Sequence, residues 1–133
     1  MRKPAVFVSR SVHPSVLERL GAVCDVRAWP EKGRCPADVL AKEIQDVEGV
    51  IGTDPWDASL MDQAPRLRHI SLTSVGFDMV DLDAATKRGI LVTNTAGSLT
   101  DTVADLVFAL MLGAARRVTE MERWTRAGQW RSV

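Results

Sequence analysis

The chain alternates short apolar runs with segments whose apolar residues recur at helical spacing. The apolar runs predict five strands, at residues 5–9, 24–29, 49–53, 67–73 and 90–94. The segments between them predict four helices, at residues 13–21, 36–45, 57–64 and 81–89. Strands that alternate with helices imply a parallel sheet with right-handed crossovers and helices on both faces. The pattern therefore predicts an α/β fold with a flavodoxin-like, doubly wound parallel five-stranded sheet.

Local signals set the expected ends of these helices. Gly21 and Gly89 are expected to stop the first and the fourth helix, and Pro36 is expected in the first turn of the second. Asp57 precedes the third helix, where an acidic side chain caps free backbone N–H groups.

The pattern changes after Asn94, where a loop rich in Thr, Ser and Gly leads into one long linking helix. This helix is expected from about Val103 to about Ala127, with Gly128 as its stop. Thr102 and Asp105 have the spacing of a capping box, and Asp105 is expected in the first turn, where the helix dipole stabilises it. Apolar residues surround the first half of the helix, so we expect that half to be buried against another domain or another copy of the chain.

Composition excludes several classes of protein. The chain has 133 residues, 46% of them hydrophobic, and no net formal charge, which argues against a nucleic-acid partner. The start lacks the apolar run of a signal peptide, and the longest apolar stretch, "VADLVFALMLGAA", is too short to span a membrane. Cys24 and Cys35 form neither a metal-ligand nor a redox motif, so we expect reduced thiols in a cytoplasmic protein.

The segment "LTSVGFDMVD", residues 72–81, breaks at a glycine between an expected strand and an expected helix. Backbone N–H groups left free at the carboxyl end of a strand can hold an anion, and Gly76 would allow a positive φ and the close approach of a ligand. Ser74, Val75 and Gly76 are therefore a candidate binding site, unless the glycine only turns the chain. Gly52 and Thr53 end the neighbouring strand and could border the same cleft or be purely structural.

One stretch, "LTSVGFDMVDLDAATKRGILVTNTAGSLTDTVADLVFALMLGAARR", closely resembles the D-isomer-specific 2-hydroxyacid dehydrogenases. The nearest branch is that of the glyoxylate and hydroxypyruvate reductases. The resemblance covers nearly the whole chain and is strongest from Leu67 to Arg117. It implies an oxidoreductase that transfers hydride between NAD or NADP and a small 2-keto acid or D-2-hydroxy acid. It also implies that residues 1–99 begin a substrate-binding domain and that residues 100–133 lead into a Rossmann domain.

The resemblance also implies roles for individual residues. The backbone amides of Val75 and Gly76 would hold the carboxylate of the substrate. Val103 would lie close to the nicotinamide, although a valine in the core is an equal reading from the residues alone. The helix from residue 100 to residue 127 would form much of a homodimer contact, and Trp124 and Trp130 could belong to that interface.

The chain departs from the family in one large respect. No G-x-G dinucleotide motif occurs in it, and the catalytic His, its Glu partner and the substrate-binding Arg of the family would all lie further on. We therefore expect an N-terminal segment of a longer protein, which is inactive alone and has no catalytic residue of its own. His13 and His69 have no carboxylate nearby in sequence, so neither is expected to be a catalyst.

Two other functions share this architecture. Asp54 follows the third strand, where a receiver domain carries its phosphorylated aspartate, but the acidic pair that would bind Mg²⁺ after the first strand is absent. A non-enzymatic binding protein, like the corepressors that resemble these dehydrogenases, is the second alternative.

Overall fold

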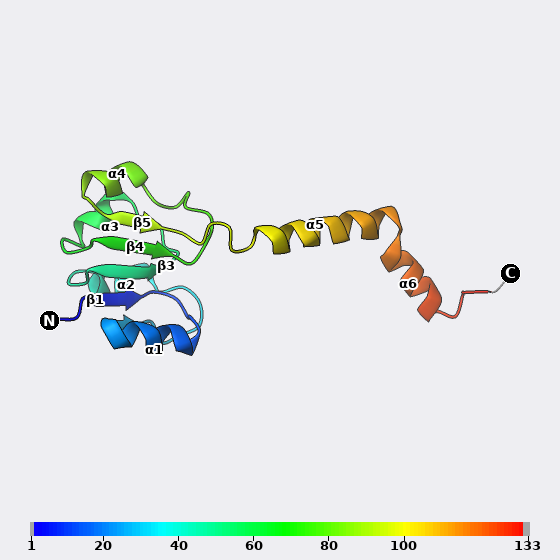
Figure 1. Cartoon of the computed structure of the whole chain (residues 1–133), viewed down its shortest axis with the longest axis horizontal. Helices are drawn as coiled ribbons and strands as arrows, with labels where there is room; N and C mark the ends of the chain where they lie inside the picture. Colours follow the sequence, from blue (N-terminus) through cyan, green and yellow to red (C-terminus); the bar gives the residue numbers. More distant parts are fainter. Residues whose placement is uncertain (1, 132–133) are drawn as a thin grey trace. The chain divides into compact units, whose positions relative to one another are not determined.

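The computed structural model describes residues 2–131 and divides into two compact units, Met1–Ala96 and Gly97–Val133. Figure 1 shows strands and helices alternating through the first unit. The strands are β1 (Ala5–Val8), β2 (Asp25–Ala28), β3 (Gly49–Gly52), β4 (His69–Leu72) and β5 (Leu91–Thr93). The helices of the first unit are α1 (Pro14–Val23), α2 (Ala37–Glu43), α3 (Ala58–Asp62) and α4 (Leu82–Lys87). The second unit holds α5 (Thr100–Ala115) and α6 (Val118–Arg126).

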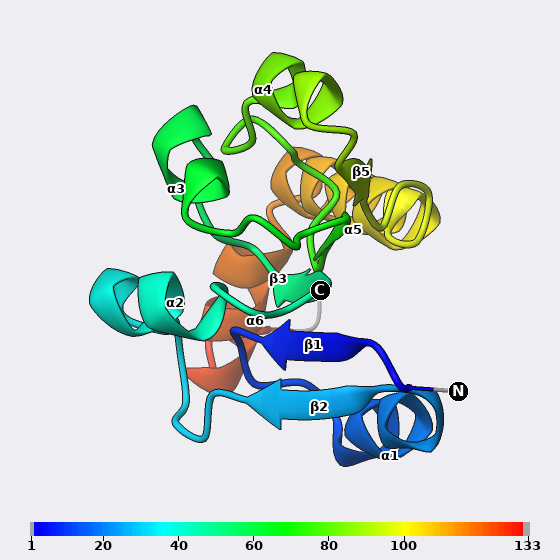
Figure 2. The same ribbon diagram turned by 90° about the vertical axis from the view of Figure 1, so that its left-hand side faces the viewer.

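The five strands form one parallel sheet in the order β2-β1-β3-β4-β5. This order confirms the predicted doubly wound α/β sheet. The order reverses between β1 and β3, because the chain first adds β2 on one side and then crosses to the other. Figure 2 shows α2 and α3 on one side of the strands and α1 on the opposite side.

One row of side chains across the sheet forms the centre of the core. Phe7 pairs with Val50, and Val50 pairs with Ile70, so these residues point to the same face. All three are almost fully buried, and they pack against apolar residues of α2, α3 and α4. The row is continuous because strands buried under helices carry β-branched and aromatic residues at these positions.

Several helix ends differ from the prediction. Gly21 lies inside α1, which continues to Val23, whereas Asp57 caps α3 as expected by accepting a hydrogen bond from Leu60 N at 2.8 Å. The prediction of a capping box formed by Thr102 and Asp105 is wrong. The helix α5 begins at Thr100, so both residues lie within it. Its first turn carries Asp101 instead, next to the N-terminal N–H groups that favour a negative charge.

The prediction of a single long helix is also wrong, because α5 and α6 are separate helices. Arg117, between them, has a left-handed backbone with φ of 54°, which interrupts the helical hydrogen-bond ladder. Its guanidinium binds both carboxylate oxygens of Glu120, at 2.7 and 2.8 Å, in the first turn of α6. The expected stop at Gly128 is confirmed by its φ of 66° just beyond α6.

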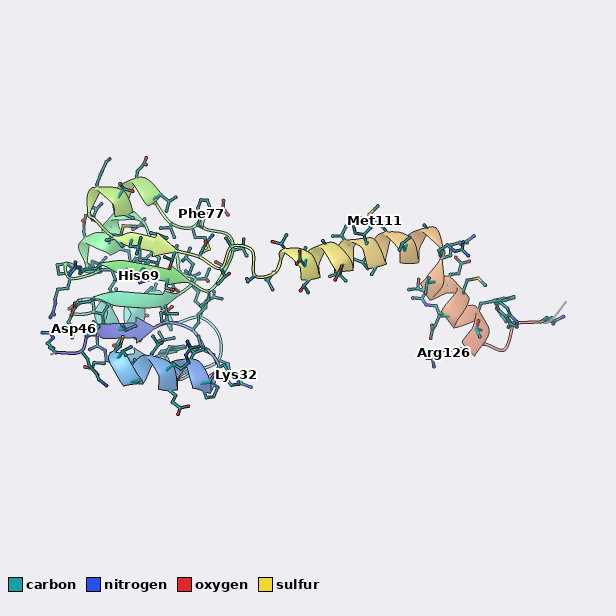
Figure 3. All side chains as sticks on the ribbon, viewed as in Figure 1. Lys32, Asp46, His69, Phe77, Met111 and Arg126 are labelled. Carbon is teal, nitrogen blue, oxygen red and sulfur yellow. The ribbon has the colours of Figure 1, made fainter. Side chains whose placement is uncertain are left out.

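Apolar side chains of α5 are exposed in this chain. Figure 3 shows Met111 projecting from the helix, and its side chain is 60% exposed. Leu106, Phe108 and Leu110 are 58–64% exposed as well, so the expected burial of this helix remains a prediction. Within residues 2–131, no helix is both long and apolar enough to span a membrane.

Candidate functional site

The candidate site is the bend of residues 74–76, just beyond the carboxyl end of β4. The neighbouring strands β3 and β5 end at the same edge of the sheet, because all the strands are parallel. Val75 is 43% exposed, and Phe77, which follows the bend, is also exposed (Figure 3). The sequence correctly placed the bend at this edge, where ligands of open α/β sheets bind.

Hydrogen bonds hold all three carbonyl groups of the bend. The hydroxyl of Ser74 donates to the carbonyl of Gly76 at 2.8 Å, and the side-chain amide of Asn94 donates to the carbonyl of Val75 at 2.7 Å. The backbone N–H of Thr95 donates to the carbonyl of Ser74 at 3.1 Å. Among the hydrogen bonds of residues 2–131, none is donated by the backbone N–H of Val75 or Gly76. The bend therefore keeps two free donors at an exposed place, which is what an anion requires.

The conformation expected at Gly76 is wrong. Positive φ occurs among the described residues at Gly33, Gly89, Gly97, Gly128 and Arg117, and Gly76 is not one of them. The bend is held instead by the hydrogen bonds to the carbonyl groups of residues 74–76. What remains of the glycine argument is access: a Cβ atom on Gly76 would lie 3.3 Å from Oδ2 of Asp78, in the space beside the free N–H groups.

Gly52 has a packing role under the site. A Cβ atom on Gly52 would overlap the hydroxyl of Ser9 and lie 2.9 Å from Oδ2 of Asp54. The absent side chain allows Ser9 and Asp54, both fully buried, to form a hydrogen bond between their side chains. Contact of Gly52 with substrate stays a prediction.

Thr53 connects the end of β3 to the bend. Its hydroxyl lies 2.9 Å from the hydroxyl of Thr73 and 3.4 Å from that of Ser74, which in turn holds Gly76. The structure therefore brings Thr53 to the edge of the bend, as the sequence predicted. It also adds Asn94, which the sequence analysis missed; the available signal was a polar side chain directly after β5, at the same edge of the sheet.

The environment of Asp54 does not support a phosphoacceptor. Its side chain has no solvent exposure, one oxygen accepts a hydrogen bond from Ser9, and the other lies 3.6 Å from Nε of Arg34. No group of three potential metal ligands occurs among the described residues. An aspartate that accepts phosphate needs an open face and a bound Mg²⁺, so Asp54 is placed to anchor structure rather than to react.

The two histidines make local polar contacts. Nδ1 of His13 accepts a hydrogen bond from Ser15 N at the start of α1. Nε2 of His69, on β4, lies 2.9 Å from the hydroxyl of Thr93 on β5. Neither imidazole is paired with a carboxylate in the part of the chain that the structure describes. Both therefore lack the orienting acid that a general acid–base histidine uses.

The second unit carries the remaining predicted residues. Val103 lies on α5 with its side chain 52% exposed, so the valine is not a core residue of this unit. Its contact with a cofactor stays a prediction. Trp124 and Trp130 pack edge to face, with ring centroids 5.8 Å apart and planes inclined by 65°. Part of their apolar surface is therefore used within the chain, and a role at an interface stays a prediction.

Comparison with known proteins identifies the family. The family of the D-isomer specific 2-hydroxyacid dehydrogenase catalytic domain matches residues 6–126. The chain is 39% identical over 131 residues to a glyoxylate reductase of Thermococcus kodakarensis, covering 97% of this chain and 39% of that protein. A glyoxylate reductase of Aeropyrum pernix is 42% identical over 132 residues, covering 98% and 39%.

A solved structure agrees with these sequence matches. It is an NADPH-dependent glyoxylate/hydroxypyruvate reductase of Sinorhizobium meliloti in complex with NADP and malonate. Its TM-score is 0.75 at 34% identity, over 96% of this chain and 39% of that one. The chain thus spans about two fifths of the length of the relatives it matches. It belongs to the D-isomer-specific 2-hydroxyacid dehydrogenase family.

Proposed function

We propose that this chain is the N-terminal, substrate-binding part of an NAD(P)-dependent reductase of a small 2-keto acid, with glyoxylate or hydroxypyruvate as substrate. The observation that carries the proposal is the pair of free N–H groups at Val75 and Gly76, beyond the carboxyl end of β4. The names of the relatives, which are glyoxylate reductases, support the substrate class.

The bend would act by binding and orientation. Two backbone donors can hold one carboxylate, which fixes the adjacent carbonyl carbon of the substrate in place. The side chain of Val75 is uncharged, which fits a substrate with a single carboxylate better than a highly charged one. The backbone donors themselves do not change protonation state with pH.

The nicotinamide would supply the hydride when bound. Val103 is the residue of this chain that we propose to contact it, through an apolar side chain that can shape the ring pocket. The sequence contains no G-x-G motif, so we assign no pyrophosphate contact to these residues. The acid–base residues are likewise assigned to the complete protein, and the 133-residue chain alone should show no turnover.

We also propose that residues 1–99 begin the substrate domain and that residues 100–133 form a linking and dimerisation segment. The exposed apolar side chains of α5 support a homodimer, because a patch of this kind is unfavourable in water. Leu106→Glu with Leu110→Glu should make the complete protein monomeric by light scattering. Val23→Glu, at an exposed position at the end of α1 and outside residues 100–133, is the matched control. A double variant that stays dimeric would contradict the assignment.

A cytoplasmic location is part of the same proposal. Cys24 and Cys35 are both free thiols, which is usual in a reducing compartment. Fractionation of cells that express the complete protein would test it, and recovery in a secreted fraction would contradict it.

The activity test is steady-state oxidation of NADH or NADPH by the complete protein with glyoxylate or hydroxypyruvate. Turnover of either acid supports the proposal, and its absence with both contradicts it. Gly76→Arg should raise KM for the keto acid steeply, roughly tenfold or more, because a long side chain would fill the approach to the N–H groups. An unchanged KM would remove the site assignment while leaving the activity intact.

A further inference from the structure

We propose that Asn94 is a positioning residue that holds the substrate-binding bend in the shape that exposes its two N–H groups. The inference rests on the proposed function, because it concerns how the same bend binds a carboxylate. Asn94 directly follows β5, and its side-chain amide crosses to the bend after β4 to donate to the carbonyl of Val75 at 2.7 Å. The contact joins residues that lie 19 positions apart in the sequence.

The planarity of the peptide bond explains how this contact controls a donor on the other side. No peptide bond among the described residues is cis, so each backbone N–H points opposite to the carbonyl of the preceding residue. The carbonyl of Val75 faces the amide of Asn94, and the N–H of Gly76 therefore points away from Asn94. The bond from Asn94 thus sets the direction of one of the two proposed carboxylate donors.

The second donor is set in the same way from the neighbouring residue. The carbonyl of Ser74 accepts a hydrogen bond from the backbone N–H of Thr95, so the N–H of Val75 points away from Thr95. Both holding groups belong to the segment after β5, and both free N–H groups are consequently turned away from it. Of the two bonds donated by this segment, the one from Asn94 is made by a side chain and the one from Thr95 by the backbone. A substitution at Asn94 therefore removes its bond without altering the backbone of the segment.

Loss of the amide should affect binding more than folding. Asn94 and the carbonyl of Val75 are exposed, so water can replace the amide as donor and no buried group is left unpaired. The peptide group between Val75 and Gly76 would then be free to rotate. A carboxylate would have to order that group on binding, and the cost would appear in affinity.

The test uses the complete protein and compares Asn94→Ala and Asn94→Asp with Thr93→Val. Asn94→Asp keeps the shape of the side chain but replaces the donor with an acceptor. Thr93→Val, one residue earlier, removes the hydrogen bond to His69 and leaves the bend untouched, so it is the matched control. The readouts are the dissociation constant of oxalate by calorimetry, KM and kcat with glyoxylate, and the melting temperature.

We expect Asn94→Ala to raise both the oxalate dissociation constant and KM roughly five- to tenfold, with kcat changed less than about twofold. Asn94→Asp should weaken binding at least as much, and Thr93→Val should leave all three constants unchanged. Unaltered oxalate affinity in both Asn94 variants would overturn the inference. So would a lowered melting temperature with equal losses in kcat and affinity, because that result would mark a general structural role.

The oxalate arm separates this inference from the proposed function. A wild-type protein that binds oxalate but reduces neither keto acid would contradict the function, and weaker oxalate binding by Asn94→Ala would still support the role of Asn94. A wild-type protein that binds no oxalate and reduces neither keto acid would overturn both.

Discussion

Gly52 lies so close to Ser9 that no side chain can stand between them. A Cβ atom on Gly52 would overlap the hydroxyl of Ser9, which donates to the buried carboxylate of Asp54. This contact joins the ends of β1 and β3, where the strand order reverses and where many doubly wound proteins bind their ligands. Here that position is filled by the side chains of the protein, and the free backbone donors occur at the end of β4 instead.

Gly52→Ala should therefore destabilise the protein by about 1–3 kcal/mol, because the new methyl group forces Ser9 and Asp54 apart in a packed interior. Gly21→Ala is the matched control. Gly21 lies inside α1 with no atom within 4 Å of a built Cβ, so alanine there should stabilise by up to about 1 kcal/mol. Urea unfolding would measure both free energies. Equal effects from the two substitutions would contradict the packing role of Gly52.

Asp78 is a negative charge beside the bend. Its Oδ2 atom lies 3.3 Å from the position of a Cβ on Gly76, and among residues 2–131 its carboxylate makes no hydrogen bond or ion pair. Asp78→Asn should lower KM for glyoxylate roughly two- to fourfold at low ionic strength by removing a repulsion, and less at high salt. Steady-state kinetics at two salt concentrations would show this. A KM that does not fall at low salt would argue against a carboxylate on the bend.

Protonation of Asp46 in acid should break its ion pair with Arg27, which connects β2 to the segment after α2. The guanidinium of Arg27 holds the carboxylate of Asp46 at 2.5 and 3.1 Å, and this hydrogen bonding lowers the pKa of Asp46. A lowered folded-state pKa gives stability that is present above the ordinary value, about 3.9, and is lost as the pH falls through the folded-state value. Asp46→Asn should therefore lower the melting temperature slightly at neutral pH. The difference from wild type should shrink in acid, and a gap that stayed constant would contradict this link.

The two cysteines should differ in reactivity. Burial first, and the nearby charge of Asp54 second, raise the pKa of the Cys35 thiol, which is 2% exposed. A buried neutral thiol reacts slowly with alkylating reagents, whereas Cys24 is partly exposed. Peptide mapping after brief treatment with iodoacetamide should find label on Cys24 and little on Cys35 until urea is added. Equal labelling of the native protein would contradict the burial of Cys35.

The sheet could be predicted from the sequence because its signals are local. Each strand is a short apolar run bounded by turn residues. Strands that alternate with helices imply a parallel sheet. The break at Arg117 could not be predicted in this way. Neither Gly nor Pro marks it, and a left-handed arginine is uncommon, so the sequence pattern favours an unbroken helix.

The candidate site was predictable in position but not in construction. Gly76 marked the end of β4, and a strand end in an open sheet is where ligands bind. Contacts that shape the bend come from Thr53 and Asn94, which directly follow β3 and β5, and their approach depends on the packing of the whole sheet. The same dependence explains why Gly52, a plain strand end in the sequence, proved to be a point of close packing.

The most direct test is a crystal structure of the complete protein with oxalate bound. If the two free backbone N–H groups of this bend bind the carboxylate of the substrate, one carboxylate of oxalate should accept hydrogen bonds from both Val75 N and Gly76 N. Oxalate bound away from residues 74–76, with both N–H groups facing solvent, would contradict the account.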